Sequence, residues 1–396
     1  MRTFDFRIQS SLAYLGLMTW FDDLVNKEGM FSALEILSAL LVVVAICALF
    51  FAIKWQMAQA KLSQLQHEHR LNAQRVVQPK QAFDPELQDL YAAKAQEARD
   101  LHHTIRRFIP KQFIHHLSAK HETELKVGFA DEDDLAILFV DICQFSHLAE
   151  TLSPQQILNF LNSFFLRMNA PIHANNGFID KFNGDAIMAL FDHPDGNEHD
   201  KVMDSLQAAI GLRLALNLYN EHRENSGYQP INIGIGVHYG PVIIGTVGTE
   251  DRMDTTALGD SVNIAYRLEG LCRSYHADII ISEQVVLNLP PGHKMTFRIL
   301  DNVIVKGRSQ GQKIYEVLSH LPKQQQIIKL AQEKEIVTCL SLRKQQRLDE
   351  LVDVASCCIT RYPTEPVFKQ FLAQAEYLTR HPQHENKSGA INSPLI

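Results

Sequence analysis

The longest unbroken apolar stretch of the chain lies near its start. Residues 36–53 include one clearly polar side chain, Ser38, and apolar residues extend the stretch toward the N-terminus. A helix of this length spans a bilayer, so we predict a transmembrane helix at residues 31–53. A cleaved signal peptide is disfavoured because the stretch begins far from Met1 and has no small-residue cleavage site. A buried core helix is disfavoured because no polar stripe interrupts the stretch.

Basic residues around this stretch predict its orientation. Lys27 precedes it, whereas Lys54, Lys61 and Arg70 follow it. Because positive residues favour the cytoplasmic side, we expect a single-pass protein of the cell (inner) membrane whose following part is cytoplasmic. Residues 1–30 would then form an extracytoplasmic or interfacial segment.

Residues 54–126 are predicted to form a helical linker or stalk. They are rich in Gln, Lys, Glu, Arg and Ala, with leucines at helix-compatible intervals. Pro79 and Pro85 should interrupt the helix because proline lacks the amide hydrogen that a helix interior needs. Paired stalks in a dimer would form a short coiled coil, but the heptads here are irregular.

Residues 127–320 alternate between strand and helix patterns. Strands are predicted at residues 135–140, 177–181, 185–191, 231–239, 242–247, 279–281, 296–300 and 313–317. Helices are predicted at residues 154–175, 201–222 and 261–275. Turns at Asn183–Gly184 and Gly240–Pro241 would each close a hairpin. The order strand, helix, hairpin, helix, strand indicates an α/β (α+β) domain built on a ferredoxin-like sheet.

Residues 321–396 return to helical spacing. Apolar residues recur over 340–354 and 367–375, and the prolines Pro363 and Pro366 lie between the two segments. A C-terminal helical hairpin followed by a disordered end, from about His381, is therefore predicted.

Composition excludes little. The formal net charge of −7 and the pI near 6.2 give no basic patch, which disfavours nucleic acid as a partner. The six cysteines are scattered without the spacing of a metal knuckle, so reduced thiols are expected.

Two aspartates are the strongest candidates for chemistry. Asp141 ends an apolar strand, and Asp185 follows an Asn-Gly turn. Each alone is more often a helix cap or a turn former. Together, a strand end and a hairpin of one sheet can place two hard carboxylates side by side, as Mg²⁺ or Mn²⁺ bound to triphosphate requires.

Three segments resemble the signature blocks of class III nucleotidyl cyclases: ILFVDICQFSHL, GFIDKFNGDAIMALF and MDTTALGDSVNIAYRLE. Each motif alone is weak, but all three occur in the family's order within residues 127–320. The resemblance implies an adenylyl cyclase that converts ATP to 3',5'-cyclic AMP and pyrophosphate. It also implies two Mg²⁺ or Mn²⁺ ions. One membrane anchor with one cyclase domain is typical of a bacterial protein.

The resemblance assigns the metal and phosphate sites. Asp141, Asp185 and the Ile142 carbonyl would hold the two ions. Backbone amides would cradle phosphate at the entry to the next helix, in the loop Cys143, Gln144, Phe145 and Ser146. The family usually has glycine where Gln144 stands.

The resemblance also assigns the transition-state residues. Asn263 and Arg267 lie one turn apart on a predicted helix, where a solvated face is the ordinary interpretation. In the family, this Asn orients the ribose and this Arg stabilises charge on the α-phosphate, a task suited to a rigid guanidinium. Lys306 matches a lysine that contacts the terminal phosphates, although any loop lysine would look the same.

Base choice depends on Lys181 and Thr256. A lysine donates to adenine N1 and a threonine hydroxyl accepts from the exocyclic amine, whereas guanine presents the opposite groups. GTP-selective relatives carry Glu and a small residue at these positions, which favours ATP here. A guanylyl cyclase is the first alternative. A catalytically inactive cyclase-like sensor or scaffold is the second, disfavoured because all six key positions are filled.

The resemblance finally implies a homodimer. In the family, the metal aspartates of one subunit face the base-binding and transition-state residues of the other, and this chain contains both sets. The predicted stalk contains no ligand-binding pattern that identifies an activating signal. Control through the membrane segment, through a regulatory partner or through the helical tail stays open.

Overall fold

The computed structural model describes residues 33–76, 85–105, 110, 112–113, 128, 130–193, 196–249, 251–304 and 311–381. The chain divides into two compact units, Met1–Gln96 and Glu97–Ile396.

Two helices precede the sheet. Helix α2 runs without a break over Ala33–Val76, and α3 begins at Pro85 and ends at Ile105. Proline at the first position of a helix costs nothing because that amide has no intrahelical acceptor. Pro79 lies outside the described residues. The described residues include no helix with the length and apolar character needed to cross a bilayer, and the transmembrane helix at 31–53 stays a prediction.

The second unit is built on a mixed sheet. Its strands are β1 (Ala130–Ile142), β2 (Gly177–Asn183), β3 (Ala186–Phe191), β4 (Ile233–Gly248), β5 (Met253–Leu258), β6 (Ile279–Ser282), β7 (Phe297–Val303) and β8 (Gln312–Val317). Its helices are α5 (Phe145–Glu150), α6 (Pro154–Ala174), α7 (Glu198–Asn225), α8 (Asp260–Tyr275), α9 (Glu283–Leu287), α10 (Lys323–Ala331), α11 (Glu333–Lys344), α12 (Leu348–Arg361) and α13 (Val367–Arg380).

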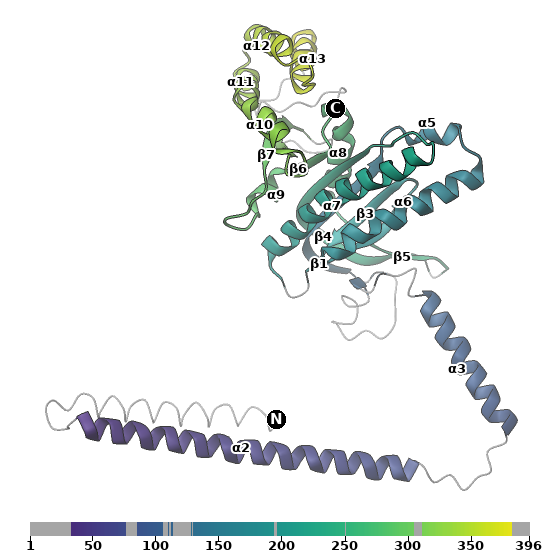
Figure 1. Cartoon of the computed structure of the whole chain (residues 1–396), viewed down its shortest axis with the longest axis vertical. Helices are drawn as coiled ribbons and strands as arrows, with labels where there is room; N and C mark the ends of the chain where they lie inside the picture. Colours follow the sequence, from purple (N-terminus) through teal and green to yellow (C-terminus); the bar gives the residue numbers. More distant parts are fainter. Residues whose placement is uncertain are drawn as a thin grey trace. The chain divides into compact units, whose positions relative to one another are not determined.

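The strands lie in the order β2-β3-β1-β4-β6-β8-β7, and β5 pairs with the end of β4. All described pairings are antiparallel except β4 with β6. The sequence order β1, α6, β2-β3, α7, β4 is the ferredoxin-like order that was predicted. Helices α6 and α7 cover one face of the sheet (Figure 1) and bury the larger apolar core against it.

Helix α8 covers the opposite face, and glycine lets it come close. Gly236 of β4 faces α8, where a Cβ atom would lie 2.2 Å from the Glu269 amide nitrogen and 2.5 Å from the Ala265 carbonyl. Backbone cannot yield to such contacts, so only glycine permits this approach. The helix is thereby fixed against the centre of the sheet.

The hairpin predicted at Gly240–Pro241 is wrong. Strand β4 runs straight through, with Leu135 opposite Gly240 and Asp134 opposite Pro241. On its other edge β4 pairs with β6 at Ile235–Val237 and with β5 from Ile243 onward, which leaves a gap between them. Proline has no amide hydrogen to donate, so it is tolerated where that edge is unpaired.

The tail contains four described helices instead of two. The turn predicted at Pro363 and Pro366 lies between α12 and α13, but the first predicted segment, 340–354, is wrong because it spans the end of α11 and the start of α12. Helix α10 precedes α11. Gln346 adopts a left-handed conformation (φ 61°) and separates α11 from α12. Apolar side chains of α11, α12 and α13 form one core with α8 and strands β6, β7 and β8.

Two buried arginines join this tail to the sheet. Arg298 of β7, 1% exposed, donates to Glu316 (2.8 Å), Gln332 (2.7 Å) and Glu365 (2.9 Å). These acceptors come from β8, from the start of α11 and from the turn before α13.

The second buried arginine reaches α8. Arg343 of α11 donates to Asp301 of β7 and to Gln374 of α13. Asp301 also accepts from the Tyr275 hydroxyl (2.5 Å) in the last turn of α8 and from Gln374 (2.9 Å). Gln370 donates to the Ser274 carbonyl (2.7 Å), so α13 also satisfies the end of α8. The tail is thus an integral part of the unit.

Replacing Asp301 with asparagine should strongly destabilise the protein. The Asp301 and Arg343 side chains are almost fully buried, so losing one charge leaves the other unpaired, at a cost of about 3–5 kcal/mol of unfolding free energy. Glu350→Gln breaks the half-exposed Arg347–Glu350 pair of the same tail and should cost less than about 1 kcal/mol. Urea unfolding of the full chain measures both. Equal effects would contradict the integral role of the tail.

Candidate active site

The structure brings Asp141 and Asp185 together. Asp141 is the next-to-last residue of β1, and Asp185 immediately precedes β3. These strands are antiparallel neighbours, with Val140 opposite Ile187, so the end of β1 lies beside the start of β3. The two carboxyl groups lie close enough for Asp185 to raise the pKa of Asp141. The backbone of Ile142 follows at the same edge.

Burial and the neighbouring Asp185 make ionisation of Asp141 costly. The pKa of Asp141 is raised to about 7, first by burial and then by the hydrogen bond and charge of Asp185. The pKa of Glu269, on α8, is also raised to about 7 by burial and by the charges of Asp141 and Asp185. Converging carboxylates that repel one another are what a divalent cation relieves, so this donor set fits Mg²⁺ or Mn²⁺.

The described residues offer few metal ligands beyond Asp141 and Asp185. The described residues include no group of three or more His, Cys, Asp or Glu side chains placed to hold a metal ion. Mg²⁺ is usually bound through one or two carboxylates, with water and substrate phosphate completing its shell. A nucleotide triphosphate would therefore be part of the coordination.

Glu269 was missed from the sequence. An acidic residue on a helix usually faces solvent, but here α8 lies close to β4 and the side chain turns toward Asp141. A Cβ atom at Gly234, which pairs with Asp141, would lie 2.7 Å from Glu269 Oε1. The alternating glycines Gly234 and Gly236 were the available signal, because they mark a closely packed helix.

The predicted phosphate loop is a tight turn before α5. Gln144 adopts a left-handed conformation (φ 61°, ψ 31°), where glycine is favoured, which explains the residue typical of the family. The Cys143 amide donates to the Asn232 carbonyl (2.8 Å), so it is already engaged and does not face phosphate. Helix α5 has no side-chain cap, and the amides of Phe145 and Ser146 have no intrahelical acceptor. These two remain as the candidate phosphate donors.

Lys181 and Thr256 meet through a third residue, Asp180. The Thr256 hydroxyl donates to Asp180 Oδ2 (2.8 Å), and Lys181 Nζ lies 3.8 Å from the same oxygen. Lys181 also donates to Asp254 (3.2 Å). The strand pairing shifts between Ile179 and Lys181, so a β-bulge at Asp180 brings neighbouring side chains to one site.

Asp180 is a buried carboxylate that the sequence did not reveal. Burial raises the pKa of Asp180 to about 6, although the Thr256 hydrogen bond and the charge of Lys181 lower it. Its Oδ1 atom has no hydrogen-bond partner among the described residues. Thr256 and Lys181 thus hold the Asp180 carboxylate in a buried position where its ionisation costs free energy. Such buried, perturbed carboxylates are typical of functional sites.

Two further predicted residues, Asn263 and Arg267, lie on α8. Asn263 is exposed and Arg267 is half-buried, one turn apart on α8. Between them, Tyr266 packs edge-on against Phe139 of β1, with ring centroids 5.5 Å apart. Lys306 lies outside the described residues.

The predicted residues form two groups with separate surroundings. The arginine whose charge acts on Asp141 is Arg273, two turns of α8 beyond the Asn263–Arg267 pair. Lys181 and Thr256 instead share Asp180.

This sheet, with a carboxylate pair at the end of β1 and an Asn-Arg pair on α8, defines a nucleotide cyclase catalytic fold. Residues 127–319 match the Adenylate and Guanylate cyclase catalytic domain family. This match covers just under half of the chain.

Named relatives are adenylate cyclases. Adenylate cyclase of Anabaena cylindrica is 41% identical over 216 residues, which cover 53% of this chain and 42% of that protein. The terminal-differentiation specific adenylate cyclase of Dictyostelium discoideum is 30% identical over 270 residues, 67% of this chain and 12% of that protein. The chain therefore spans less than half the length of these relatives.

A solved structure agrees. The structure of a bacterial light-regulated adenylyl cyclase superposes with a TM-score of 0.52 at 26% identity, covering 62% of this chain and 68% of that one. The mixed sheet with its helices is thus a cyclase catalytic fold.

Replacing Asp180 with asparagine should change how stability depends on pH. Because folding raises the pKa of Asp180, the stability that its protonation supplies is present below about pH 4 and lost as pH rises through about 6. The unfolding free energy of wild type minus that of Asp180→Asn should therefore fall between pH 4 and pH 6 and stay level above pH 7. Urea titrations across this range, with the exposed Asp353→Asn as a control, measure the difference. A difference independent of pH would refute the role of burial.

Proposed function

We propose that the chain is an adenylate cyclase that converts ATP to 3',5'-cyclic AMP and pyrophosphate. The observation that carries this proposal is the Asp141–Asp185 pair at the edge of a cyclase sheet. The adenylate cyclase names of the relatives support the substrate. The 3'-oxygen of the ribose bonds to the α-phosphorus, the bond from that phosphorus to the pyrophosphate oxygen breaks, and the hydroxyl proton is released.

The metal site would serve the attacking and leaving groups. Asp141, Asp185 and the Ile142 carbonyl would hold two Mg²⁺ or Mn²⁺ ions, which when bound lower the pKa of the ribose hydroxyl and neutralise the triphosphate. Arg267 donates to the α-phosphate oxygens, where negative charge grows, and Asn263 orients the ribose. Lys306 contacts the terminal phosphates.

Base selection rests on a hydroxyl that Asp180 orients. The Thr256 hydrogen points to Asp180 Oδ2, so the oxygen lone pairs face away from it and accept from the adenine amine. Lys181 donates to adenine N1. Guanine presents a carbonyl and a protonated N1 to these groups, so both contacts are mismatched.

The activity is tested on the purified full chain with Mn²⁺ and either ATP or GTP. Cyclic AMP should form from ATP in large excess over cyclic GMP from GTP, and EDTA should abolish it. Asp185→Ala should lower the rate at least about a hundredfold, since it removes several kcal/mol of charge stabilisation. Asp353→Ala, an exposed aspartate of α12, is the matched control.

Three outcomes would overturn parts of the proposal. Preference for GTP would make the chain a guanylyl cyclase. No product from either nucleotide, with the fold intact by circular dichroism, would favour an inactive cyclase-like sensor or scaffold. Full activity of Asp185→Ala would reject the metal assignment.

The active unit is a homodimer in this proposal. The separate surroundings of the two residue groups support it, because Asp141 and Asp185 of one copy can then face Lys181, Thr256, Asn263 and Arg267 of the other. Mixing inactive Asp141→Ala and Arg267→Ala chains should restore one working site in each heterodimer. Folded heterodimers without activity would contradict the shared site.

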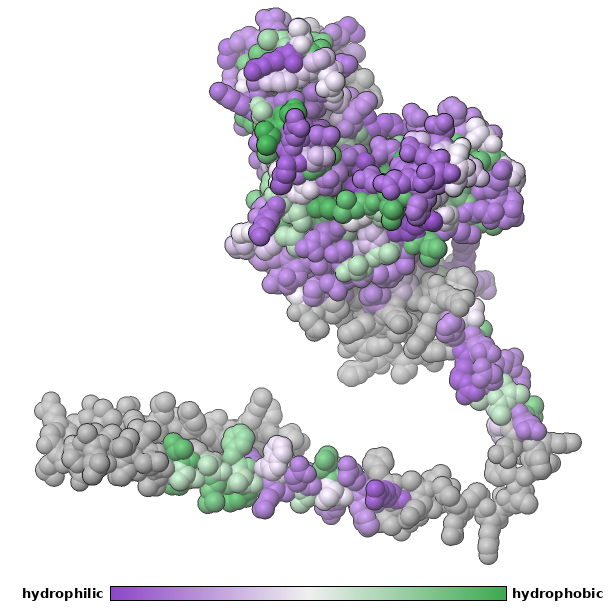
Figure 2. Space-filling model, in the orientation of Figure 1, coloured by the Kyte–Doolittle hydropathy of each residue, from purple (hydrophilic) through white to green (hydrophobic). Residues whose placement is uncertain are grey.

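We also propose that residues 31–53 anchor the chain in the inner membrane with the cyclase domain in the cytoplasm. The apolar sequence supports this, and so does the described part of α2, on which Figure 2 shows hydrophobic residues in green. The large apolar side chains exposed there are Val44, Ile46, Leu49, Phe50, Phe51 and Ile53. The full chain should stay with membranes after alkaline carbonate washing, whereas a chain lacking residues 1–53 should not. Release of the full chain into the wash would reject the anchor.

A further inference from the structure

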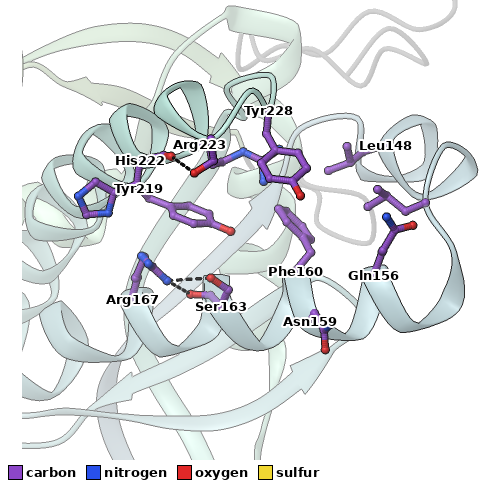
Figure 3. A pocket seen from close by; sticks show the side chains of 12 residues that line it. Leu148, Gln156, Asn159, Phe160, Ser163, Arg167, Tyr219, His222, Arg223 and Tyr228 are labelled. Atoms are coloured by element: carbon purple, nitrogen blue, oxygen red, sulfur yellow. Dashed lines mark hydrogen bonds between the residues drawn. The ribbon is translucent and has the colours of Figure 1, made fainter.

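A pocket of about 350 Å³ opens between α5, α6 and the end of α7. Figure 3 shows it from close by, with Phe160 and Arg167 of α6 facing Tyr219 and Arg223 of α7. The candidate metal, base-binding and transition-state residues do not line it. It is therefore separate from the candidate active site, and its volume is at the low end of those that bind small molecules.

The pocket is positively charged. Arg167 and Arg223 line it, and none of its described lining residues is Asp or Glu. Neither arginine forms an ion pair with a described residue. Burying a guanidinium without a neighbouring anion costs free energy, so a bound anion would stabilise this pocket.

Arg223 is held in place by aromatic rings. It is 8% exposed, and its guanidinium lies 5.0 Å from the ring centre of Phe160 and 5.6 Å from those of Tyr219 and Tyr228. Its Nε donates to the Gln229 carbonyl (2.9 Å), which fixes the plane of the group. The described residues supply no acceptor to its two Nη groups, and these are free to bind a ligand oxygen pair.

Arg167 is equally fixed. It donates to the Ser163 carbonyl (2.9 Å) and to the Ser163 hydroxyl (2.8 Å), drawn as dashed lines in Figure 3, and lies 4.7 Å from the Tyr219 ring centre. Two preorganised guanidinium groups against three aromatic rings match a ligand with an anionic head and a flat apolar body.

We propose that this pocket binds a small organic anion, a carboxylate or phosphate ester attached to an aromatic or apolar group. Leu148 and Leu152 extend the apolar lining beyond the rings, and the two arginines receive the anionic head. The lining residues take no part in the proposed cyclase reaction, so binding at this site does not depend on that proposal.

The pocket is joined to the candidate phosphate loop by stacked rings. Phe160 of the lining stacks on Phe145, the first residue of α5, with ring centres 6.2 Å apart and 16° between planes. Leu148 of the lining also belongs to α5. Occupancy should therefore shift α5 and alter the turnover of the proposed reaction, a consequence that rests on the proposed function.

Calorimetric titration of the full chain tests binding without any catalytic step. The probes are benzoate, phenyl phosphate, inorganic phosphate and the uncharged benzyl alcohol. Benzoate or phenyl phosphate should bind, and the tighter of the two identifies the head group as carboxylate or phosphate. Inorganic phosphate and benzyl alcohol should bind at least tenfold more weakly, because phosphate lacks the apolar group and benzyl alcohol lacks the anionic head.

Arg167→Gln should weaken the better probe at least tenfold, about 1.4 kcal/mol. Arg361→Gln is the matched control, because it removes a guanidinium stacked 5.2 Å from a tyrosine ring outside the pocket, and it should leave binding unchanged. Arg223→Gln, with its fold checked by circular dichroism, should act like Arg167→Gln. Absence of binding by the wild type, equal binding by Arg167→Gln, or equal binding of benzyl alcohol and benzoate would overturn the proposal.

Discussion

The antiparallel pairing of β1 with β4 is the constraint on which the rest of the domain depends. It runs from Ala130 opposite Gly245 to Ile142 opposite Ile233. One edge of β1 is thereby fixed, and β3 takes the other edge, which sets Asp185 beside Asp141. Because side chains alternate along β1, Leu138 and Val140 face the core under α6 and α7, while Ile137 and Phe139 face the other side. A slip of one residue would exchange these faces.

Helix α8 connects the candidate active-site residues to the C-terminal tail, and catalysis would require both to be held rigidly. Its first half carries Asn263 and Arg267, its middle brings Glu269 toward Asp141, and its last residue, Tyr275, binds Asp301. The contact of Gly236 with the helix backbone sets the distance between α8 and the sheet. The buried arginines of the tail then hold the far end of the helix. Preorganised donors are effective only when their supports are rigid in this way.

The sequence pattern revealed candidate site residues that stand at a visible strand end or turn. It missed those that tertiary packing brings to the site. Asp141 and Asp185 could be predicted because a strand end and an Asn-Gly turn are visible in the chain. Thr256 and Lys181 were named only through family resemblance, and β5 was not predicted. Asp180 was hidden because strand alternation places it on the face opposite Lys181, and the β-bulge that overrides alternation has no clear sequence signal.

Two candidate sites of opposite charge adjoin α5. Asp141, four residues before this short helix, and Asp185 favour a cation, whereas Arg167 and Arg223, in the pocket that Leu148 of α5 helps to line, favour an anion. Helix α5 is six residues long and has no side-chain cap, so its own backbone holds it weakly. Its position therefore depends on the ring stack from Phe145 through Phe160 to Phe164, with successive centres 6.2 and 6.4 Å apart. A helix supported mainly by one face can transmit a change at that face to the loop that it follows.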